Sequence, residues 1–313
     1  MKTVFLDTEG LNDLSFEALR EECSSFRQYS QTPPEKVIER IKDTELIILN
    51  KVKINRKHLQ HCPSLKLICL VATGTDVVDL QAAKQHNITV CNCQAYGTDS
   101  VAQHVFASLL ALFTNLLSYE RSVRKGSWQK ASQFCYLDYP ITELRGKTMG
   151  IIGYGNNGRR VAELARAFGM RVEIGRRPGS SDSARPTLRE LAPALDVLTL
   201  HCPLTPETRN LVNDEILALM KPTAFLINTA RGGIVDEEAL LASLKNGKLA
   251  GAATDVLTVE PPVHSNPLID AQLPNLIITP HVAWASREAR EEIIHQTLEN
   301  IKNFKNGHPI RTV

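Results

Sequence analysis

Residues 148–169 read TMGIIGYGNNGRRVAELARAFG, an apolar run followed by a glycine-rich turn and a helical pattern. Gly153, Gly155 and Gly158 have the G-x-G-x-x-G spacing, which is a weak signal when it stands alone. Here the spacing lies between a predicted strand and a predicted helix, and the free N–H groups at a helix start attract phosphates. We therefore predict a βα unit that binds the pyrophosphate of a dinucleotide.

Each residue of this turn has its own place in the prediction. Gly153 permits the tight turn, Gly155 lets the backbone approach a pyrophosphate, and Gly158 lets the helix pack closely on the strand. Asn156 and Asn157 open the helix and are expected to contact the cofactor, although an amide at 157 loses packing on the helix. The alternative is a plain glycine-rich turn without a ligand.

Further apolar runs alternate with amphipathic segments on both sides of this turn, which is typical of a parallel sheet covered by helices. In the second half of the chain, strands are predicted at residues 148–153, 171–175, 196–201, 224–229, 251–256 and 276–279. In the first half, they are predicted at residues 3–6, 45–50, 65–72 and 87–92. The fold class is therefore α/β, with two doubly wound parallel sheets. Residues 99–284 are expected to form a domain inserted between 1–98 and 285–313.

Three helices are predicted with some precision. One lies around Phe16–Glu22, and one long helix runs from Asp99 to Lys125, with Gly126 at its end. A final helix spans about Ser286–Asn306. The stretch from Val101 to Leu117 is the most apolar of the chain, but its polar residues leave it short of the roughly 20 apolar residues that cross a bilayer.

The composition narrows the class of protein. A chain of 313 residues suits about two domains, and 43% hydrophobic and 22% charged residues are ordinary for a globular protein. The net charge of +2 gives no reason to expect a nucleic acid or a membrane surface as a partner. The N-terminal residues lack the pattern of a signal peptide, so we expect a cytoplasmic protein.

The seven cysteines indicate a reduced chain. Their number is odd and no C-x-x-C pair occurs, so buried thiols are expected. Cys91 and Cys93 lie near His86, which leaves a metal site as an alternative, but the spacing is unlike the usual zinc patterns. We expect no metal.

The segment MRVEIGRRPGSS, residues 170–181, bears on the choice of cofactor. NAD sites usually place an acid about 20 residues after the glycine-rich turn to bind the ribose 2′-hydroxyl. Counted from Gly158, that place falls at Arg176, and Arg177 follows. Guanidinium groups suit a 2′-phosphate, and Ser180 and Ser181 can add hydroxyls. We therefore predict that NADPH is preferred over NADH, the alternative being a solvated pair of surface arginines.

Three chemically active side chains follow apolar runs near the C-terminus. Arg231 comes after AFLINTA, Glu260 after GAATDVL and His281 after LIITP. Because ligands bind beyond the carboxyl ends of parallel strands, we expect these residues to converge at one sheet edge. His281 can donate or accept a proton near neutral pH, Glu260 can fix its tautomer and favour the protonated ring, and Arg231 can bind a carboxylate.

Several motifs resemble the D-isomer specific 2-hydroxyacid dehydrogenase family. INTARGGIVDEEAL, DVLTVEPP and TPHVAWAS occur in the order and spacing of that family, and VATGTD and HCPLTPETRNLV also match it. The resemblance covers nearly the whole chain. AYGTDSVAQ, FCYLDYP and HVAWASREAR are most similar to the branch of glycerate dehydrogenases and hydroxypyruvate or glyoxylate reductases.

The resemblance implies a Rossmann dinucleotide-binding domain at 99–284 and a flavodoxin-like substrate-binding domain from the remaining residues, with the active site in the cleft. It assigns catalysis to Arg231, Glu260 and His281. It also implies the following contacts: Gly74, Arg231 and His281 with the substrate; Thr98 with the nicotinamide; and Thr229, Ala230 and Asp255 with the cofactor. Asp255 has an alternative role as a strand-end cap, and Trp284 either walls the pocket or packs.

The expected reaction is the NADPH-dependent reduction of a small 2-keto acid, hydroxypyruvate or glyoxylate, to the D-2-hydroxy acid. By the same resemblance, a homodimer is expected through the long helix near Val101–Arg121. Two alternatives stay open: a corepressor-like protein that senses NAD(P), and an oxidoreductase similar to phosphite dehydrogenase. Such corepressors usually carry disordered tails, which this sequence lacks, so we favour the enzyme.

Overall fold

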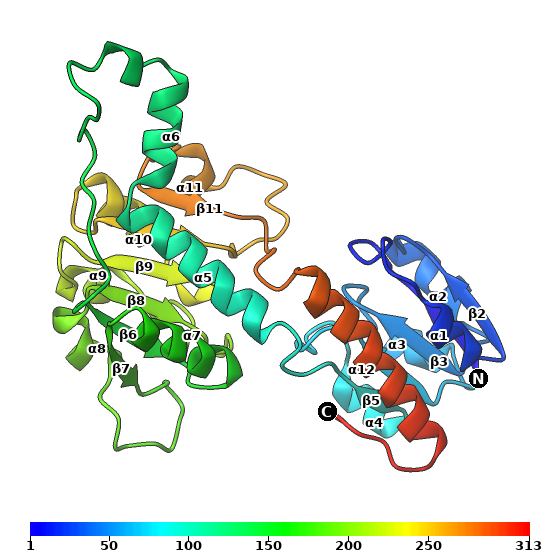
Figure 1. Cartoon of the computed structure of the whole chain (residues 1–313). Coiled ribbons are helices and arrows are strands. Elements are labelled where there is room, and N and C mark those ends of the chain that lie inside the picture. The colour runs from blue at the N-terminus through cyan, green and yellow to red at the C-terminus, as the bar shows by residue number, and fades with distance from the viewer. The chain divides into compact units, whose positions relative to one another are not determined.

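The computed structural model describes residues 1–313 and divides into two compact units. The terminal unit consists of Met1–Gly97 and Ala285–Val313, and the central unit consists of Thr98–Trp284. Each unit is a parallel sheet with helices packed against it (Figure 1). The predicted α/β fold with two doubly wound sheets is confirmed.

The terminal unit contains a five-stranded parallel sheet in the order β2-β1-β3-β4-β5. This is the flavodoxin-like order, in which the chain reverses its direction of growth between β1 and β3. Its strands are β1 (Lys2–Phe5), β2 (Ser25–Gln28), β3 (Leu46–Leu49), β4 (Leu67–Leu70) and β5 (Thr89–Cys91). β2 is absent from the sequence prediction, because this edge strand is mostly exposed and lacks the apolar run that marks the other four.

Short helices and one long helix cover this sheet. They are α1 (Glu17–Glu21), α2 (Val37–Ile41), α3 (Arg56–Gln60), α4 (Leu80–Gln85) and α12 (Arg287–Lys305), with a 3-10 turn at Pro34–Lys36. The predicted final helix is confirmed as α12. The hydroxyl of Ser286 caps its start by accepting a hydrogen bond from the N–H of Ala289, 3.2 Å away.

The central unit contains a six-stranded parallel sheet in the order β11-β10-β9-β8-β6-β7. Its strands are β6 (Thr148–Ile152), β7 (Arg171–Gly175), β8 (Val197–Leu200), β9 (Phe225–Asn228), β10 (Gly251–Thr254) and β11 (Leu276–Ile278). All six match strands that the sequence predicts. The chain builds outward from β6 to β7 and then returns to place β8 on the other side of β6. A ligand crevice is expected where this reversal occurs, beyond the carboxyl ends of β6 and β8.

The helices of the central unit bury both faces of its sheet. They are α5 (Thr98–Phe113), α6 (Leu116–Arg124), α7 (Asn156–Ala167), α8 (Leu188–Leu191), α9 (Asp214–Leu219), α10 (Glu237–Lys245) and α11 (Pro267–Asp270). The central unit also contains three 3-10 turns, at Trp128–Lys130, Ala192–Ala194 and Gly232–Ile234. Side chains alternate along each strand, so Met149 and Ile151 pack with α5 and α7, whereas Ile152 packs with α8 to α11.

The predicted single helix from Asp99 to Lys125 is wrong. The helix breaks between α5 and α6, where Asn115 adopts a left-handed conformation with φ 51°, and the two pieces are bent by 61°. Asparagine tolerates this conformation better than most residues, and the helical pattern of the flanking residues hides the break. No single helix is long and apolar enough to cross a membrane, and only this bent pair passes such a test, by length and composition alone.

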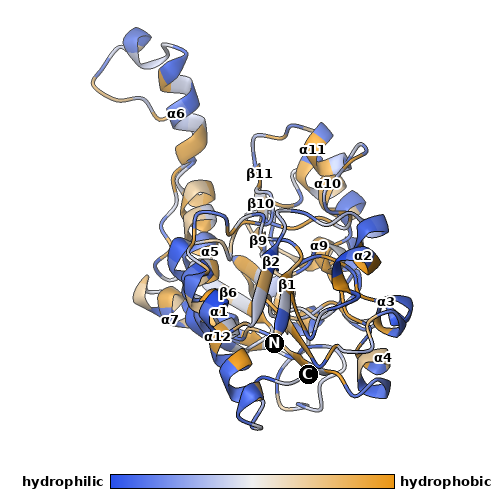
Figure 2. Cartoon of the chain, turned by 90° about the vertical axis from the view of Figure 1, so that its right-hand side faces the viewer, coloured by the Kyte–Doolittle hydropathy of each residue, from blue (hydrophilic) through white to orange (hydrophobic).

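The apolar residues of α5 and α6 have different surroundings. Those of α5, such as Val105 and Leu109, are buried in the core of their own unit. Leu116 on α6 and Phe134 and Leu137 beyond it are 59%, 86% and 78% exposed. α6 and the segment that follows it project away from the sheet of the central unit, and orange apolar positions alternate with blue ones along them (Figure 2).

Candidate active site and dinucleotide pocket

Arg231 follows strand β9 and is held by its backbone. The buried Asn228 at the end of the strand donates from Nδ2 to the Arg231 carbonyl at 3.0 Å and accepts at Oδ1 from the Ala230 N–H at 3.1 Å. One guanidinium nitrogen donates to the Ala230 carbonyl at 2.8 Å. The remaining guanidinium nitrogens have no hydrogen bond within the protein, so Arg231 can bind an anionic group.

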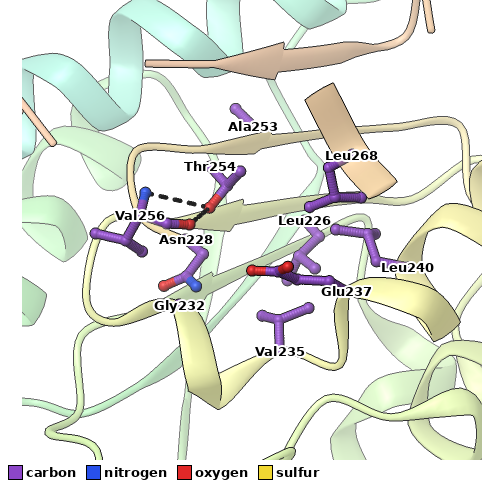
Figure 3. Close-up of a pocket in the computed structure, with 10 residues that line it drawn as sticks. All are labelled: Leu226, Asn228, Gly232, Val235, Glu237, Leu240, Ala253, Thr254, Val256 and Leu268. Carbon is purple, nitrogen blue, oxygen red and sulfur yellow. Dashed lines mark hydrogen bonds between the residues drawn. The ribbon is translucent and has the colours of Figure 1, made fainter. Parts of the chain in front are cut away.

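Gly232 fixes the neighbouring chain segments together. A Cβ at this position would collide with the backbone of Leu257 and Thr258, so only glycine lets the two segments approach this closely. Figure 3 shows a small cavity beside this contact, between β9, β10 and the start of α10. Its volume of about 10 Å³ suits a single water molecule and excludes a substrate.

Glu260 and His281 form the closest pair of ionisable side chains in the candidate site. Glu260 Oε2 lies 2.6 Å from His281 Nδ1, and Glu260 Oε1 accepts a hydrogen bond from the Leu257 N–H at 2.8 Å. The side chains are 33% and 35% exposed, so a ligand can reach them. Nε2 of His281 has no partner within the protein, which leaves this nitrogen available to exchange a proton.

The surroundings of Glu260 favour its charged form. Partial burial acts in the opposite direction, but the hydrogen bonds from His281 and the Leu257 N–H outweigh it. The positive charges of His281 and Arg231 add to this effect, so the pKa of the Glu260 carboxyl lies below its usual value. An ionised Glu260 can accept a hydrogen bond from Nδ1 of His281, which leaves Nε2 facing outward.

The turn that carries His281 is anchored by Asp255. This carboxylate is 2% exposed and accepts hydrogen bonds from the N–H groups of Val282 and Ala283 at 2.9 and 2.8 Å, and from the Thr279 hydroxyl at 2.6 Å. The His281 N–H donates to the Asp255 carbonyl at 2.8 Å. These bonds maintain His281 in the left-handed region, with φ 55°, which non-glycine residues rarely adopt.

The alternative role of Asp255 as a strand-end cap is therefore what the structure shows, and its contact with a nicotinamide stays a prediction. Two further side chains hold the same turn from α5. The Ser100 hydroxyl donates to the Ala283 carbonyl at 2.7 Å, and His104 Nε2 lies 3.0 Å from the Thr279 hydroxyl. The Trp284 indole donates to the His281 carbonyl at 3.0 Å, so Trp284 packs on the turn as well.

The glycine-rich turn joins β6 to α7. Gly153 has φ 98°, and a Cβ there would collide with the backbone between His201 and Cys202. A Cβ on Gly158 would collide with the Gly153 carbonyl. Gly155, in contrast, has no atom within 4 Å of the place where a Cβ would lie, so this side of the turn is open.

The start of α7 is suited to a phosphate. No side chain caps the helix, and Asn156 and Asn157 lie in its first turn. Its free N–H groups and the positive end of the helix dipole attract anions. At the end of β9, the buried hydroxyl of Thr229 has no hydrogen-bond partner. An open glycine, an uncapped helix and an unpaired hydroxyl are the features that a bound dinucleotide would complete.

A pocket of about 270 Å³ lies beyond the carboxyl ends of β6, β7 and β8, at the reversal point of the sheet. Residues at the end of these three strands or after them line it: Gly153, Tyr154, Gly155, Gly175, Arg176, Arg177, Ser180, Asp182, Arg185, His201, Cys202 and Pro203. The guanidinium groups of Arg176 and Arg177 have no hydrogen bond or ion pair within the protein. Arg185, in contrast, pairs with Asp182 at 3.0 Å.

His201 is a neutral wall of this pocket. Burial lowers the pKa of His201 to about 4, and its Nε2 lies 3.0 Å from the Thr199 hydroxyl. Burial also raises the pKa of the neighbouring Cys202 thiol to about 11. At neutral pH, the positive charge of the pocket therefore comes from the arginines.

Gly74 belongs to the terminal unit and follows strand β4. The adjacent Thr73 is fixed by its hydroxyl, which donates to the Cys93 carbonyl at 2.9 Å, and by its carbonyl, which accepts from Asn92 Nδ2 at 2.8 Å. A role of Gly74 or Thr98 in binding ligands stays a prediction. No group of three or more His, Cys, Asp or Glu side chains in residues 1–313 is placed to hold a metal ion.

Sequence reasoning missed the residues that hold this site in place. Asn228 and His104 lie within apolar runs, and a polar residue in such a run is a signal of a hydrogen bond inside the fold. Arg185 lies in a polar loop, and nothing in the sequence distinguishes it from a surface residue. The two stretches around His281 and Asp255 are 26 residues apart, so their contact requires the sheet order.

Comparison with known proteins gives a consistent assignment. The family model "D-isomer specific 2-hydroxyacid dehydrogenase, NAD binding domain" matches residues 106–283. The chain is 45% identical to a glycerate dehydrogenase of Methylorubrum extorquens, covering 100% of this chain and 98% of that protein. It is 38% identical to a hydroxypyruvate reductase of Blautia hydrogenotrophica, covering 100% and 99%.

A solved structure supports the same assignment. The NADPH-dependent glyoxylate/hydroxypyruvate reductase of Sinorhizobium meliloti, in complex with NADP and malonate, matches 100% of this chain and 96% of its own. The TM-score is 0.83 and the sequence identity is 28%. The glycine-rich turn and the trio of Arg231, Glu260 and His281 lie in the region that the family model covers. The chain therefore belongs to the D-isomer specific 2-hydroxyacid dehydrogenase family.

Proposed function

We propose that this dehydrogenase reduces small 2-keto acids, hydroxypyruvate or glyoxylate, to D-2-hydroxy acids with NADPH. The observation that carries the proposal is the 2.6 Å contact between Glu260 Oε2 and His281 Nδ1, with Nε2 left free. This pairing prepares an imidazole to give a proton to a carbonyl oxygen. Relatives named glycerate dehydrogenase and hydroxypyruvate reductase support this substrate class.

The three side chains divide the work. A bound nicotinamide supplies the hydride. His281 gives a proton from Nε2 to the oxygen that becomes negatively charged, and Glu260 stabilises the protonated ring beforehand. Arg231 binds the substrate carboxylate and polarises the carbonyl with its free guanidinium nitrogens. In the reverse direction, His281 accepts the proton from the hydroxyl group.

The preference for NADPH rests on the unpaired arginines. The cofactor would lie on Gly153–Gly158 and the start of α7, with Thr229 beside it. Arg176 and Arg177 follow β7 directly, where an acid that binds a 2′-hydroxyl would stand, and Asp182, the acid further along the same pocket, is paired with Arg185. A 2′-phosphate would give these cations a partner. The related Sinorhizobium meliloti enzyme, whose structure contains NADP, agrees with this choice.

A substrate panel tests the proposal directly. Glyoxylate, hydroxypyruvate, pyruvate and bulkier keto acids are each assayed with NADPH and NADH by the loss of reduced-nicotinamide absorbance. We expect the highest kcat/KM with hydroxypyruvate or glyoxylate and NADPH. An equal or higher kcat/KM with NADH refutes the cofactor preference. Phosphite with oxidised cofactor is included, and its turnover in place of keto acids refutes the reaction.

We also propose a homodimer in the cytoplasm. The supporting observation is the exposed apolar set on α6 and the segment after it, since such surfaces mark protein contacts. The buried residues of α5 offer no such surface, so the interface is expected at α6 rather than along Val101–Phe113. Sedimentation that gives a monomer at micromolar concentration refutes the dimer.

A further inference from the structure

The loop that carries Glu260 has little structure of its own. It connects the end of β10 at Thr254 with the start of α11 at Pro267, and it contains neither helix nor strand. Val259 and Val263 on this loop are 60% and 73% exposed, so they contribute little packing. At the start of the loop, Val256 and Leu257 are 2% and 9% exposed, so apolar packing holds that end. Between Thr258 and Asn266, polar contacts hold the loop that carries Glu260.

Glu237 supplies two of these contacts. Its Oε1 accepts a hydrogen bond from the Thr258 N–H at 2.6 Å, two residues before Glu260, and its Oε2 accepts from Asn266 Nδ2 at 2.9 Å. One carboxylate thus binds both ends of the loop. Figure 3 shows Glu237 at the start of α10, among the residues that line the small cavity.

Helix α10, which carries Glu237, is held firmly in the fold. Asp236 caps α10 by accepting a hydrogen bond from the Ala239 N–H at 3.1 Å, and Leu240 and Leu244 bury the helix in the core. The helix follows the Arg231 segment directly in the chain. Glu237 therefore links the element that carries Arg231 to the loop that carries Glu260.

The side chain of Asn266 is also fixed by hydrogen bonds. It is 7% exposed, and its Oδ1 caps α11 by accepting from the N–H groups of Leu268 and Ile269 at 3.0 and 3.3 Å. Because Oδ1 is occupied, only Nδ2 is available for Glu237. A carboxylate is the group that can accept from Nδ2 and from the Thr258 N–H at the same time.

We propose that Glu237 is a positioning residue. Its hydrogen bonds hold the loop so that Glu260 remains in contact with His281. This inference rests on the proposed function, in which Glu260 stabilises the protonated ring of His281. Glu237 does not touch substrate in this account. It acts only through the loop, so its loss should change how Glu260 influences proton transfer.

The test compares Glu237→Gln with Glu238→Gln. Both changes remove one negative charge from the first turn of α10, and Glu238 is exposed and has no hydrogen bond within the protein. The amide of Glu237→Gln can accept from Thr258 but presents N–H groups to the amide of Asn266. We expect kcat for keto-acid reduction to fall on the order of 10-fold in Glu237→Gln, because small misplacements of catalytic groups are costly.

The pH profile separates positioning from a general loss of structure. When Glu260 leaves His281, the protonated ring loses its partner, so the alkaline limb of the kcat/KM profile should move to lower pH by about 0.5–1 unit. The KM for NADPH should not change. Glu238→Gln should match the wild type in both respects. A Glu237→Gln profile with an unmoved alkaline limb overturns the proposal, whatever its kcat.

Two further variants keep the test decisive. Asn266→Asp retains the cap of α11 but places a second carboxylate against Glu237, so it should move the limb in the same direction even if Glu237→Gln does not fold. Glu260→Gln tests the underlying function. If it leaves the limb unmoved, the proposed role of Glu260 fails. If it moves the limb while Glu237→Gln and Asn266→Asp do not, only the positioning role fails.

Discussion

The central unit contains two groups of ionisable residues: Glu260 with His281, and Arg176 with Arg177. The two groups differ in the partners they have within the protein. Glu260 and His281 contact each other, and the surrounding backbone binds both residues. The guanidinium groups of Arg176 and Arg177 have no partner within the protein. The difference separates a group whose members are partners of each other from a group that has no partner within the protein.

This contrast has a physical reason. In the proposed reaction, proton transfer requires a fixed distance and tautomer, so orienting His281 in advance would favour it. Phosphate recognition gains most from cations that have not already been neutralised, because a charge-assisted bond to an unpaired guanidinium replaces only water. In the same pocket, Asp182 pairs with Arg185, whereas Arg176 and Arg177 have no such partner, which supports the proposal that they bind the cofactor.

The largest effect is expected for the pair of Glu260 and His281. His281→Ala should lower kcat by about 10²–10³-fold, the usual loss when one transition-state hydrogen bond is removed. Stopped-flow or steady-state assays measure kcat, and fluorescence titration should give an unchanged Kd for NADPH. The exposed His264 provides the control, because His264→Ala should be silent. Near-normal turnover of His281→Ala would contradict the assignment.

The next effect concerns the wall of the arginine pocket. Burial lowers the pKa of His201 from 6.5 to about 4. An unfolded chain therefore binds a proton in this range while the folded chain does not, so stability is lost as pH falls from 6.5 to about 4. At 1.36 kcal/mol per pKa unit, the loss is at most roughly 3.4 kcal/mol.

Urea denaturation of the wild type and of His201→Gln at pH 7 and at pH 4.5 measures this loss. Many carboxylates also titrate in this interval, and they cancel in the difference between the two proteins. The glutamine variant should lose less free energy of unfolding than the wild type. Equal losses in both proteins would show that His201 titrates normally and that the pocket wall carries a charge.

A smaller effect is expected for Arg176 and Arg177. Arg176→Asp should lower the ratio of kcat/KM for NADPH over NADH by roughly 10- to 100-fold, the range of a lost hydrogen bond to a charged group. Lys248→Asp changes the charge equally at an exposed position of the same unit and should leave the ratio as it is. If Arg176→Asp does the same, the arginines are only a solvated surface pair.

The smallest effect on stability distinguishes two glycines of one turn. Gly155→Ala should change the free energy of unfolding by less than about 1 kcal/mol, since its Cβ meets no atom within 4 Å. It should still weaken NADPH binding, because the new methyl group occupies the open side of the turn. Gly158→Ala should instead destabilise the fold. Thermal unfolding and titration measure the two effects, and unweakened binding in Gly155→Ala would place the cofactor elsewhere.

The sequence predicts the strands that carry the site, because β8 to β10 are buried and read as continuous apolar runs. It also predicts that Arg231, Glu260 and His281 follow three successive strands. These strands, β9, β10 and β11, are neighbours in the sheet. The contact between Glu260 and His281 depends in addition on a loop of irregular structure, and no periodic pattern encodes such a loop.

Other features have no signal in the sequence. Glu237 and Glu238 are two adjacent acids at a helix start, and both satisfy the same preference for the helix dipole. Only the fold shows that one of them binds the loop and the other faces solvent. The break at Asn115 is hidden for a similar reason, because the helical pattern continues on both sides of a residue that tolerates either conformation.

The close approach at Gly232 has a consequence for changing substrate preference by laboratory evolution. Because no side chain fits between this residue and the backbone at Leu257, neither segment can shift alone. Libraries that vary the stretch after β9 and the stretch after β10 separately should yield mostly inactive clones. Paired libraries that keep glycine at 232 should recover activity, because the two stretches can then change together.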